Sequence, residues 1–263
     1  MMADNKAIRM PRVHSKEMHP LLSMIALILR PLVRFMFHVK PRGVENLPAK
    51  GAYILVGNHV TNVDPLAVAY FVYVQLRRAP HFLAKESLFK VPVVGPLLLA
   101  AGQIPVFRSG ARRNDEPLKV AYQYLAAGHT IAIFPEGTLT RDPNLWPMRG
   151  KYGAVRMALD CKVPIYPMAH WGAQDVLPRY GSKFRPGFWK RVDVLVGPEI
   201  DLSKYRKAQL TPAEVHEATD VVMRSITGLV EQLRGEKAPK ELWNPEQKGQ
   251  AVTGNFTKQK GKD

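Results

Sequence analysis

Short apolar runs alternate along the chain with segments of helical periodicity. The runs that fit buried strands lie at residues 52–56, 81–84, 103–107, 130–134 and 191–196. The helical patterns lie at 66–76, 97–101, 115–127, 150–161 and 211–234, and a capping box opens the last of these. Repeated strand–helix alternation predicts an α/β fold with a mixed, mostly parallel sheet flanked by helices. Pro105 indicates that its run is an edge strand or the start of a strand.

A separate apolar segment, residues 21–39, precedes the first strand. It is uncharged from Leu21 to Leu29 and then carries Arg30 and Arg34, whose spacing places them on one helical face. This pattern predicts an N-terminal amphipathic helix that lies in a membrane surface. A core-packing helix is one alternative. A membrane-spanning helix is another, although a span needs about 20 apolar residues.

Turn signals and composition divide the chain into three parts. Residues 1–50 form a basic, amphipathic region for membrane association, and Pro- and Gly-containing turns separate it from the first strand. Residues 51–234 form the predicted α/β domain. Residues 235–263 lose hydrophobic periodicity and are rich in Lys, Glu, Gln and Gly. We therefore expect this tail to be disordered.

The charge of the chain points to a polyanionic partner. Lys and Arg number 38 against 22 Asp and Glu, a net charge of +16. Such an excess suits an anionic membrane surface, phosphorylated substrates or nucleic acid. Nucleic acid is not the expected partner, because no recognised binding motif is present. The one cysteine, Cys161, excludes an internal disulfide and fits a reducing compartment, and no secretory signal is evident.

Polar side chains of catalytic type follow the predicted strands. His59 and Asp64 come after the first strand, Arg108 after the third and Glu136 after the fourth, and residues 163–167 are interpreted as a further strand-end loop. Loops at the carboxyl ends of parallel strands gather at one sheet edge, so we expect these side chains to lie together. Each also has a purely structural interpretation: Asp64 as a helix cap, Arg108 as a surface cation, Glu136 as a turn residue.

Several catalytic signatures are missing from the sequence. It contains no G-x-S-x-G elbow, no Walker A motif, no G-x-G-x-x-G after a strand and no H-E-x-x-H. Its histidines do not cluster at the spacing of metal ligands. Serine hydrolases, P-loop enzymes, dinucleotide-binding dehydrogenases and zinc hydrolases are therefore disfavoured, and we expect no metal and no cofactor.

Two short motifs, Asn58-His59-x4-Asp64 and Phe134–Thr138, follow or end predicted strands. They resemble the first and the third motif of the lysophosphatidate acyltransferase family, within the glycerolipid acyltransferase superfamily. Gly102–Arg108 and Val163–Pro167 resemble the second and the fourth. The motifs occur in family order, and the similarity covers roughly residues 51–197.

The resemblance implies acyl transfer from acyl-CoA or acyl-carrier protein to the free hydroxyl of 1-acyl-sn-glycerol-3-phosphate, giving phosphatidic acid. It implies a protein that is peripheral or monotopic on the cytoplasmic face of the cell membrane. His59 would act as general base and Asp64 would orient it. The substrate-binding residues that it implies are Arg108, Glu136, Gly137, Thr138, Arg141 and Lys85.

One departure and several alternatives accompany the resemblance. Leu139 and Thr140 separate Arg141 from Glu-Gly-Thr, whereas the family usually places arginine directly after that triplet. The same chemistry on glycerol-3-phosphate, another lysophospholipid or a glycolipid stays open. A basic nucleic-acid- or membrane-binding protein without catalysis is a more distant alternative. The carrier of the acyl group, its length and the oligomeric state are not determined by the sequence.

Overall fold

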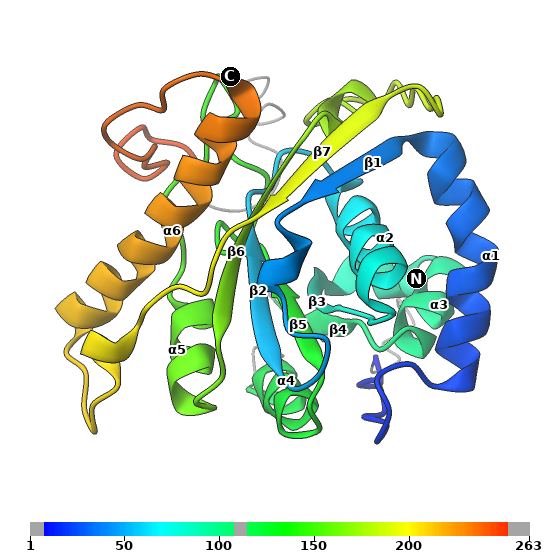
Figure 1. Cartoon of the computed structure of the whole chain (residues 1–263), viewed down its shortest axis with the longest axis horizontal. Coiled ribbons are helices and arrows are strands. Elements are labelled where there is room, and N and C mark those ends of the chain that lie inside the picture. The colour runs from blue at the N-terminus through cyan, green and yellow to red at the C-terminus, as the bar shows by residue number, and fades with distance from the viewer. Residues whose placement is uncertain (1–7, 108–114, 252–263) are drawn as a thin grey trace, which may run out of the picture.

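Figure 1 shows the computed structural model, which describes residues 8–107 and 115–251. Within these residues one seven-stranded sheet has helices on both faces. Its strands, in chain order, are β1 (His38–Arg42), β2 (Tyr53–Gly57), β3 (His81–Lys85), β4 (Ile104–Val106), β5 (Thr130–Ile133), β6 (Ile165–Trp171) and β7 (Arg191–Val196). The α-helices are α1 (Pro20–Met36), α2 (Asp64–Leu76), α3 (Val94–Ala100), α4 (Glu116–Ala126), α5 (Gly153–Asp160) and α6 (Pro212–Arg234).

The strand directions bring five strand ends to one edge. The spatial order is β1-β7-β6-β2-β5-β3-β4. The five strands β6, β2, β5, β3 and β4 are parallel to one another. β7 is antiparallel to β6, and β1 is parallel to β7. This confirms the predicted mixed, mostly parallel sheet. β4, which contains Pro105, is an edge strand as expected. The carboxyl ends of β2 to β6 therefore share the edge at which open α/β sheets bind ligands.

Burial on both faces explains why β2 is an unbroken apolar run. Ile54 and Val56 pack on the face covered by α4, α5 and α6. Tyr53 and Leu55 pack on the opposite face, with α1 and α2. None of the four side chains is more than 1% exposed. The central strand is thus rigidly held, and the loop that follows it starts from a fixed point.

Two strands were not predicted from the sequence. The N-terminal helix ends at Met36, and the residues after it form β1, which pairs with β7 at the sheet edge. The pattern missed this strand because Pro41 resembles a turn signal, yet an edge strand tolerates proline. Residues 163–167 are not a strand-end loop, since β6 begins at Ile165 and pairs with β2 and β7. Their two prolines masked the strand.

Part of the tail that we expected to be disordered is packed. Leu242 contacts the core cluster on the α6 face of the sheet. Trp243 forms a β-bridge with Met148, and its carbonyl accepts a hydrogen bond from the Arg149 amide at 3.0 Å. The prediction is wrong for residues 236–251, because two large apolar side chains anchor an otherwise polar segment. Residues 252–263 lie outside the described residues.

Helix α1 has apolar side chains on two sides. Leu22, Ile25, Val33 and Met36 are buried, and the helix packs against α2. Its other side exposes a row of large side chains, namely Leu21, Met24, Leu27, Ile28, Leu32 and Phe35. The helix therefore combines a core-packing face with an apolar face toward solvent. In the described part of the chain, no helix has the length and hydrophobicity needed to cross a membrane.

Candidate active site

The turn after β2 holds a histidine against a buried carboxylate. His59 Nδ1 lies 2.9 Å from Asp64 Oδ2, and the Asp64 side chain is fully buried at the start of α2. The same oxygen accepts hydrogen bonds from the amides of Val60 at 2.7 Å and Thr61 at 2.9 Å. When Nδ1–H donates to Asp64, the other ring nitrogen, Nε2, carries a lone pair and can accept a proton.

Asp64 was also considered as a helix cap, and the structure modifies that interpretation. Val63 occupies the cap position of α2 and makes no side-chain capping bond, while Asp64 is the first helical residue. The carboxylate instead accepts from amides in the turn before the helix. Its local role is to shape the turn that carries His59.

The loop after β5 holds the backbone and the ring of His59. The His59 amide donates to Glu136 Oε1 at 2.9 Å, and the Thr140 amide donates to the His59 carbonyl at 2.7 Å. The His59 ring stacks on Phe134 with centroids 4.2 Å apart. Thr140 is one of the two residues that depart from the family pattern, and it contributes a direct backbone contact to the histidine. The structure thus brings His59 and Glu136 together, as expected from the parallel strands.

Glu136 braces two loops and does not face solvent. Its side chain is 1% exposed, and its second oxygen accepts from the Met148 amide at 3.1 Å. Burial raises the pKa of Glu136 to about 8. This differs from the substrate contact predicted for Glu136. Sequence reasoning placed it correctly beside His59 but could not show that both oxygens are used internally.

A second histidine, which the sequence analysis did not identify, lies behind Asp64. His170 on β6 is fully buried, and its Nδ1 is 3.7 Å from Asp64 Oδ1. Its Nε2 lies 2.7 Å from the Asn58 carbonyl and is the donor of that hydrogen bond. The Asn58 side chain also exchanges hydrogen bonds with the His170 backbone, at 3.1 and 3.0 Å. These contacts lock the peptide immediately before His59 onto β6.

The other residues predicted for substrate binding differ in their burial. Gly137 has a positive φ of 69°, and a Cβ there would come within 3.1 Å of the Lys151 side chain, including Nζ. Thr138 is buried beside it at 8% exposure. Lys85 ends β3 at the same sheet edge and is exposed. Arg108 lies outside the described residues.

Arg141, which was predicted to bind substrate, is fully buried in the loop after β5. The guanidinium of Arg179 braces that loop from the other side. Its Nη1 donates to the carbonyls of Thr140 at 2.7 Å and Asp142 at 2.6 Å. No sequence signal pointed to Arg179, because it lies in the segment between β6 and β7, far along the chain from the loop that it holds.

The site has no arrangement typical of a metal centre. Among the residues that the structure describes, no three His, Cys, Asp or Glu side chains are grouped so that they could hold an ion. The chemistry that this geometry offers is proton transfer by an oriented imidazole.

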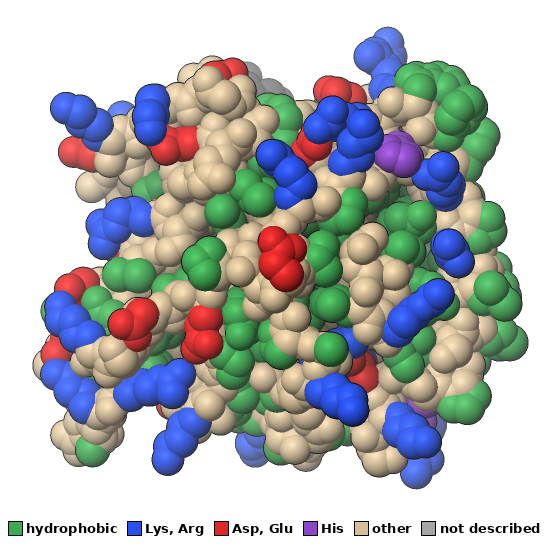
Figure 2. All heavy atoms as spheres, in the orientation of Figure 1, with side chains coloured by type: hydrophobic (Ala, Val, Ile, Leu, Met, Phe, Trp, Pro, Cys, Tyr) green, Lys and Arg blue, Asp and Glu red, His purple; other side chains and the backbone are tan. Residues whose placement is uncertain are grey.

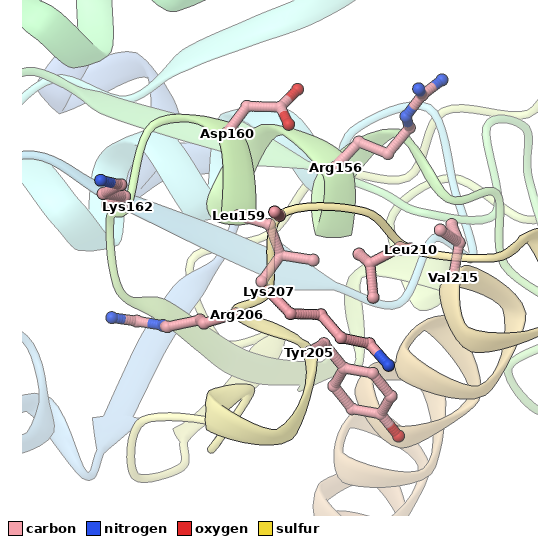
Figure 3. Close-up of a pocket in the computed structure, with 10 residues that line it drawn as sticks. Arg156, Leu159, Asp160, Lys162, Tyr205, Arg206, Lys207, Leu210 and Val215 are labelled. Carbon is pink, nitrogen blue, oxygen red and sulfur yellow. The ribbon is translucent and has the colours of Figure 1, made fainter.

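A cavity of about 500 Å³ lies apart from these loops, at the end of α5 (Figure 3). Its lining includes Leu159, Tyr205 and Leu210, with Arg156, Lys162 and Arg206 around them. α5 leads into the start of β6, and β6 is parallel to β2. The cavity therefore lies toward the sheet edge opposite the strand-end loops and is not part of this site.

Comparisons with known proteins point to one family. A family model described as Acyltransferase matches residues 38–171. The 1-acyl-sn-glycerol-3-phosphate acyltransferase of Borreliella burgdorferi is 32% identical over 173 residues, which cover 64% of this chain and 65% of that protein. A chloroplastic 1-acyl-sn-glycerol-3-phosphate acyltransferase of Brassica napus is 29% identical over 138 residues, covering 52% and 38%. The match thus spans less than two thirds of each of these curated relatives.

A solved structure has a similar fold. The crystal structure of the 1-acyl-sn-glycerophosphate acyltransferase PlsC from Thermotoga maritima matches with a TM-score of 0.59 and 24% sequence identity. The match covers 83% of this chain and 81% of that one. At this identity the likeness concerns the fold.

Proposed function

Because this chain belongs to the Acyltransferase family, we propose that it transfers a fatty acyl group to the free hydroxyl of 1-acyl-sn-glycerol-3-phosphate. The donor is a thioester, acyl-CoA or acyl-carrier protein, and the product is phosphatidic acid. The observation that carries the proposal is the 2.9 Å contact between His59 and buried Asp64 at the carboxyl end of β2. The names of the relatives from Borreliella burgdorferi and Brassica napus support the choice of acceptor.

In the proposed reaction His59 is the general base. Its Nε2 takes the proton of the acceptor hydroxyl as that oxygen bonds to the thioester carbonyl carbon. The carbon–sulfur bond then breaks, and the imidazolium returns the proton to the leaving thiolate. Asp64 stabilises the imidazolium and keeps Nδ1 protonated. The acceptor alcohol is the nucleophile, so no nucleophilic side chain is required.

The loop after β5 positions the base in this proposal. Glu136 and Thr140 hold the His59 backbone, and Phe134 supports the ring. Because positioning of bound reactants supplies a large part of enzymatic rate enhancement, a small displacement of this loop is expected to be costly.

The acceptor phosphate is proposed to bind beside Gly137. The Lys151 side chain, including its ammonium, packs into the space that a Cβ of residue 137 would need. Because glycine lacks a Cβ, this cation can lie against the turn, and we propose that it binds the phosphate there. Arg108 and Lys85 are proposed as further phosphate ligands, since Lys85 is the last residue of β3, Arg108 follows β4 in the sequence, and both strands end at this edge. Thr138 is proposed to line this phosphate site, and Arg141, which is buried in the same loop, is proposed to hold the loop in shape.

The proposed location is the cytoplasmic face of the cell membrane, with peripheral or monotopic attachment. The support is the exposed apolar face of α1 together with Arg30 and Arg34 on the same helix. An interfacial helix buries its apolar side among the acyl chains and places its cations at the headgroups. In this proposal α1, which lies within the membrane-association region predicted at residues 1–50, attaches the protein. Residues 51–234 form the acyltransferase unit, to whose sheet β1 adds an edge strand.

A product assay tests the proposal. Purified protein is given labelled acyl-CoA or acyl-carrier protein together with a panel of acceptors: lysophosphatidate, glycerol-3-phosphate, other lysophospholipids and a glycolipid. We expect the mass of phosphatidic acid from lysophosphatidate as the dominant product. Dominant acylation of another acceptor would reject the substrate but keep the chemistry, and no acylation of any acceptor would reject the activity.

A further inference from the structure

The segment between β6 and β7 exposes a group of aromatic side chains. Phe184 is 50% exposed, Phe188 62% and Trp189 70%. Phe188 and Trp189 contact each other edge to face, with ring centroids 5.0 Å apart. Side chains of this size are normally buried in a protein that meets only water. We refer to residues 176–190 as the aromatic segment.

The aromatic segment is held in place by backbone hydrogen bonds. The Arg185 amide donates to the Val176 carbonyl at 2.7 Å, and the Lys190 amide donates to the Gly187 carbonyl at 2.8 Å. The exposure of the three rings is therefore a property of a defined loop.

One end of the aromatic segment is attached to α1. The Gly187 amide donates to the Met36 carbonyl at 3.0 Å, and the His38 amide donates to the Lys190 carbonyl at 2.7 Å. In Figure 1 this segment lies beside the end of α1 that leads into β1. Figure 2 shows hydrophobic side chains along the side of the molecule formed by α1 and at the corner above it. The two exposed apolar groups thus adjoin.

The other end of the aromatic segment is attached to the candidate active site. The Thr61 hydroxyl, in the turn after His59, donates to the Leu177 carbonyl. Arg179 donates to the Thr140 carbonyl at 2.7 Å. One segment therefore connects the loops that hold His59 to the exposed face of α1.

The charged residues near these rings indicate what kind of partner contacts them. Arg30 and Arg34 on α1, and Lys183 and Arg185 in the aromatic segment, are exposed. Exposed aromatic rings beside cations are typical of surfaces that lie at the boundary of an anionic bilayer, with rings at headgroup level and cations on the phosphates. A protein partner is the alternative that the experiment below distinguishes.

We propose that the aromatic segment is a second membrane anchor, which acts with α1 and places the active-site edge at the surface of an anionic phospholipid bilayer. Two attached anchors on different elements fix the orientation of the molecule, which a single helix does not. The inference rests on the proposed function in so far as α1 is taken to lie on the membrane. Its consequence is that a long-chain acceptor in the bilayer reaches His59 without leaving the lipid surface.

The test compares the full-length protein with the variant Phe188→Ala/Trp189→Ala. Binding to vesicles of phosphatidylglycerol and phosphatidylcholine is measured by co-sedimentation. Loss of two aromatic rings from an apolar contact is expected to weaken binding about tenfold or more. Leu118→Ala is the matched control, because Leu118 is exposed on α4, away from both anchors. It should bind like the wild type.

Tryptophan quenching tests the contact directly. With brominated phosphatidylcholine in the vesicles, the bound wild type should be quenched more strongly than Trp189→Phe. Equal quenching in these two proteins, together with unchanged vesicle binding of the double variant, would overturn the inference. It would also be overturned if Phe188 and Trp189 were needed for binding to a protein partner and not for binding to vesicles.

Activity measurements separate this inference from the proposed function. The double variant should show a raised KM for a long-chain acceptor in vesicles and an unchanged kcat/KM for a short-chain acceptor dissolved as monomer. If no acceptor is acylated while vesicle binding still depends on Phe188 and Trp189, the proposed function fails and the second anchor stands. If the wild type acylates an acceptor normally but the double variant binds vesicles as well as the wild type, the proposed function stands and the second anchor is rejected.

Discussion

At the scale of single residues, the candidate site depends on contacts that fix both the backbone and the ring of His59. Its amide, carbonyl, Nδ1 and ring face each have a defined partner: Glu136, Thr140, Asp64 and Phe134. Of the two ring nitrogens, Nε2 is the one that these contacts leave for a substrate. Such fixed placement is what a general base needs, because reorganisation during the reaction is then small.

His170 is expected to act as a positioning residue. The variant His170→Leu removes the donor to the Asn58 carbonyl and leaves that oxygen buried without a partner, which costs about 1–3 kcal/mol of unfolding free energy. We also expect kcat to fall with little change in acceptor KM, because the peptide before His59 is released. His170→Gln, which can restore a donor, should recover part of both. Urea unfolding and steady-state kinetics are the measurements, and a His170→Leu protein with wild-type kcat would contradict this role.

Glu136 gives a prediction about pH. Burial raises its pKa from 4.5 to about 8, so between these values the folded protein holds a proton that the unfolded chain has released. The free energy of unfolding should therefore decrease as pH rises through this window, by up to about 1.4 kcal/mol per pH unit from this group. Glu136→Gln should flatten the dependence in urea unfolding from pH 5 to 8, whereas the exposed control Glu241→Gln should keep it. Parallel curves for wild type and Glu136→Gln would reject the assignment.

The sequence allowed part of this site to be predicted. His59, Asp64 and Glu136 were identified because each follows an apolar run, and parallel strands bring such ends together. His170 and Arg179 were missed because their partners lie far away in sequence, at Asn58 and Thr140. The burial of Glu136 was missed as well, because the sequence does not distinguish a carboxylate that faces a substrate from one that accepts hydrogen bonds within the protein.

At the scale of elements, long or fully buried segments were predicted well and marginal ones were not. β2, β5 and α6 combine strong periodicity with clear boundaries, and α6 begins at the predicted capping box. β1 and β6 contain prolines that resemble turns, and their pairing in the sheet, β1 with β7 and β6 with both β2 and β7, reveals them as strands. The 236–251 segment has almost no periodicity, because it is anchored by two side chains and not by a regular face.

The 236–251 segment is predicted to support the site through Met148. The β-bridge between Met148 and Trp243 fixes the backbone of Met148, whose amide donates a hydrogen bond to Glu136. Leu242→Ala/Trp243→Ala should lower the free energy of unfolding by about 2–4 kcal/mol, since both side chains are partly buried. It should also reduce kcat. Thermal unfolding by circular dichroism and kinetics test this, with exposed Glu241→Ala as control; unchanged stability would mean that the segment is dispensable.

At the scale of the whole molecule, charge and apolar surface act together. In the proposed membrane attachment, the net charge of +16 acts on anionic lipid over a distance of about 10 Å at 0.1 M salt, and the exposed face of α1 is proposed to provide the short-range contact. The sheet edge with the candidate site is connected to that surface through the segment between β6 and β7.

This arrangement predicts a specific dependence on salt. Binding to phosphatidylglycerol-containing vesicles should weaken as ionic strength rises, because counterions screen the long-range attraction. Binding to vesicles of phosphatidylcholine alone should be weaker and nearly independent of salt. Co-sedimentation over a salt series measures both, and equal affinity for the two lipid compositions would show that the basic surface has another partner.

The central claim is that His59 removes the proton of the acceptor hydroxyl, and one comparison tests it most directly. The turnover of His59→Gln with lysophosphatidate and acyl-CoA is measured beside the wild type and His216→Gln, an exposed histidine on α6, with circular dichroism to verify folding. We predict that His59→Gln loses about 10²- to 10⁴-fold in kcat, while His216→Gln keeps wild-type turnover. A folded His59→Gln protein with near wild-type kcat would contradict the account.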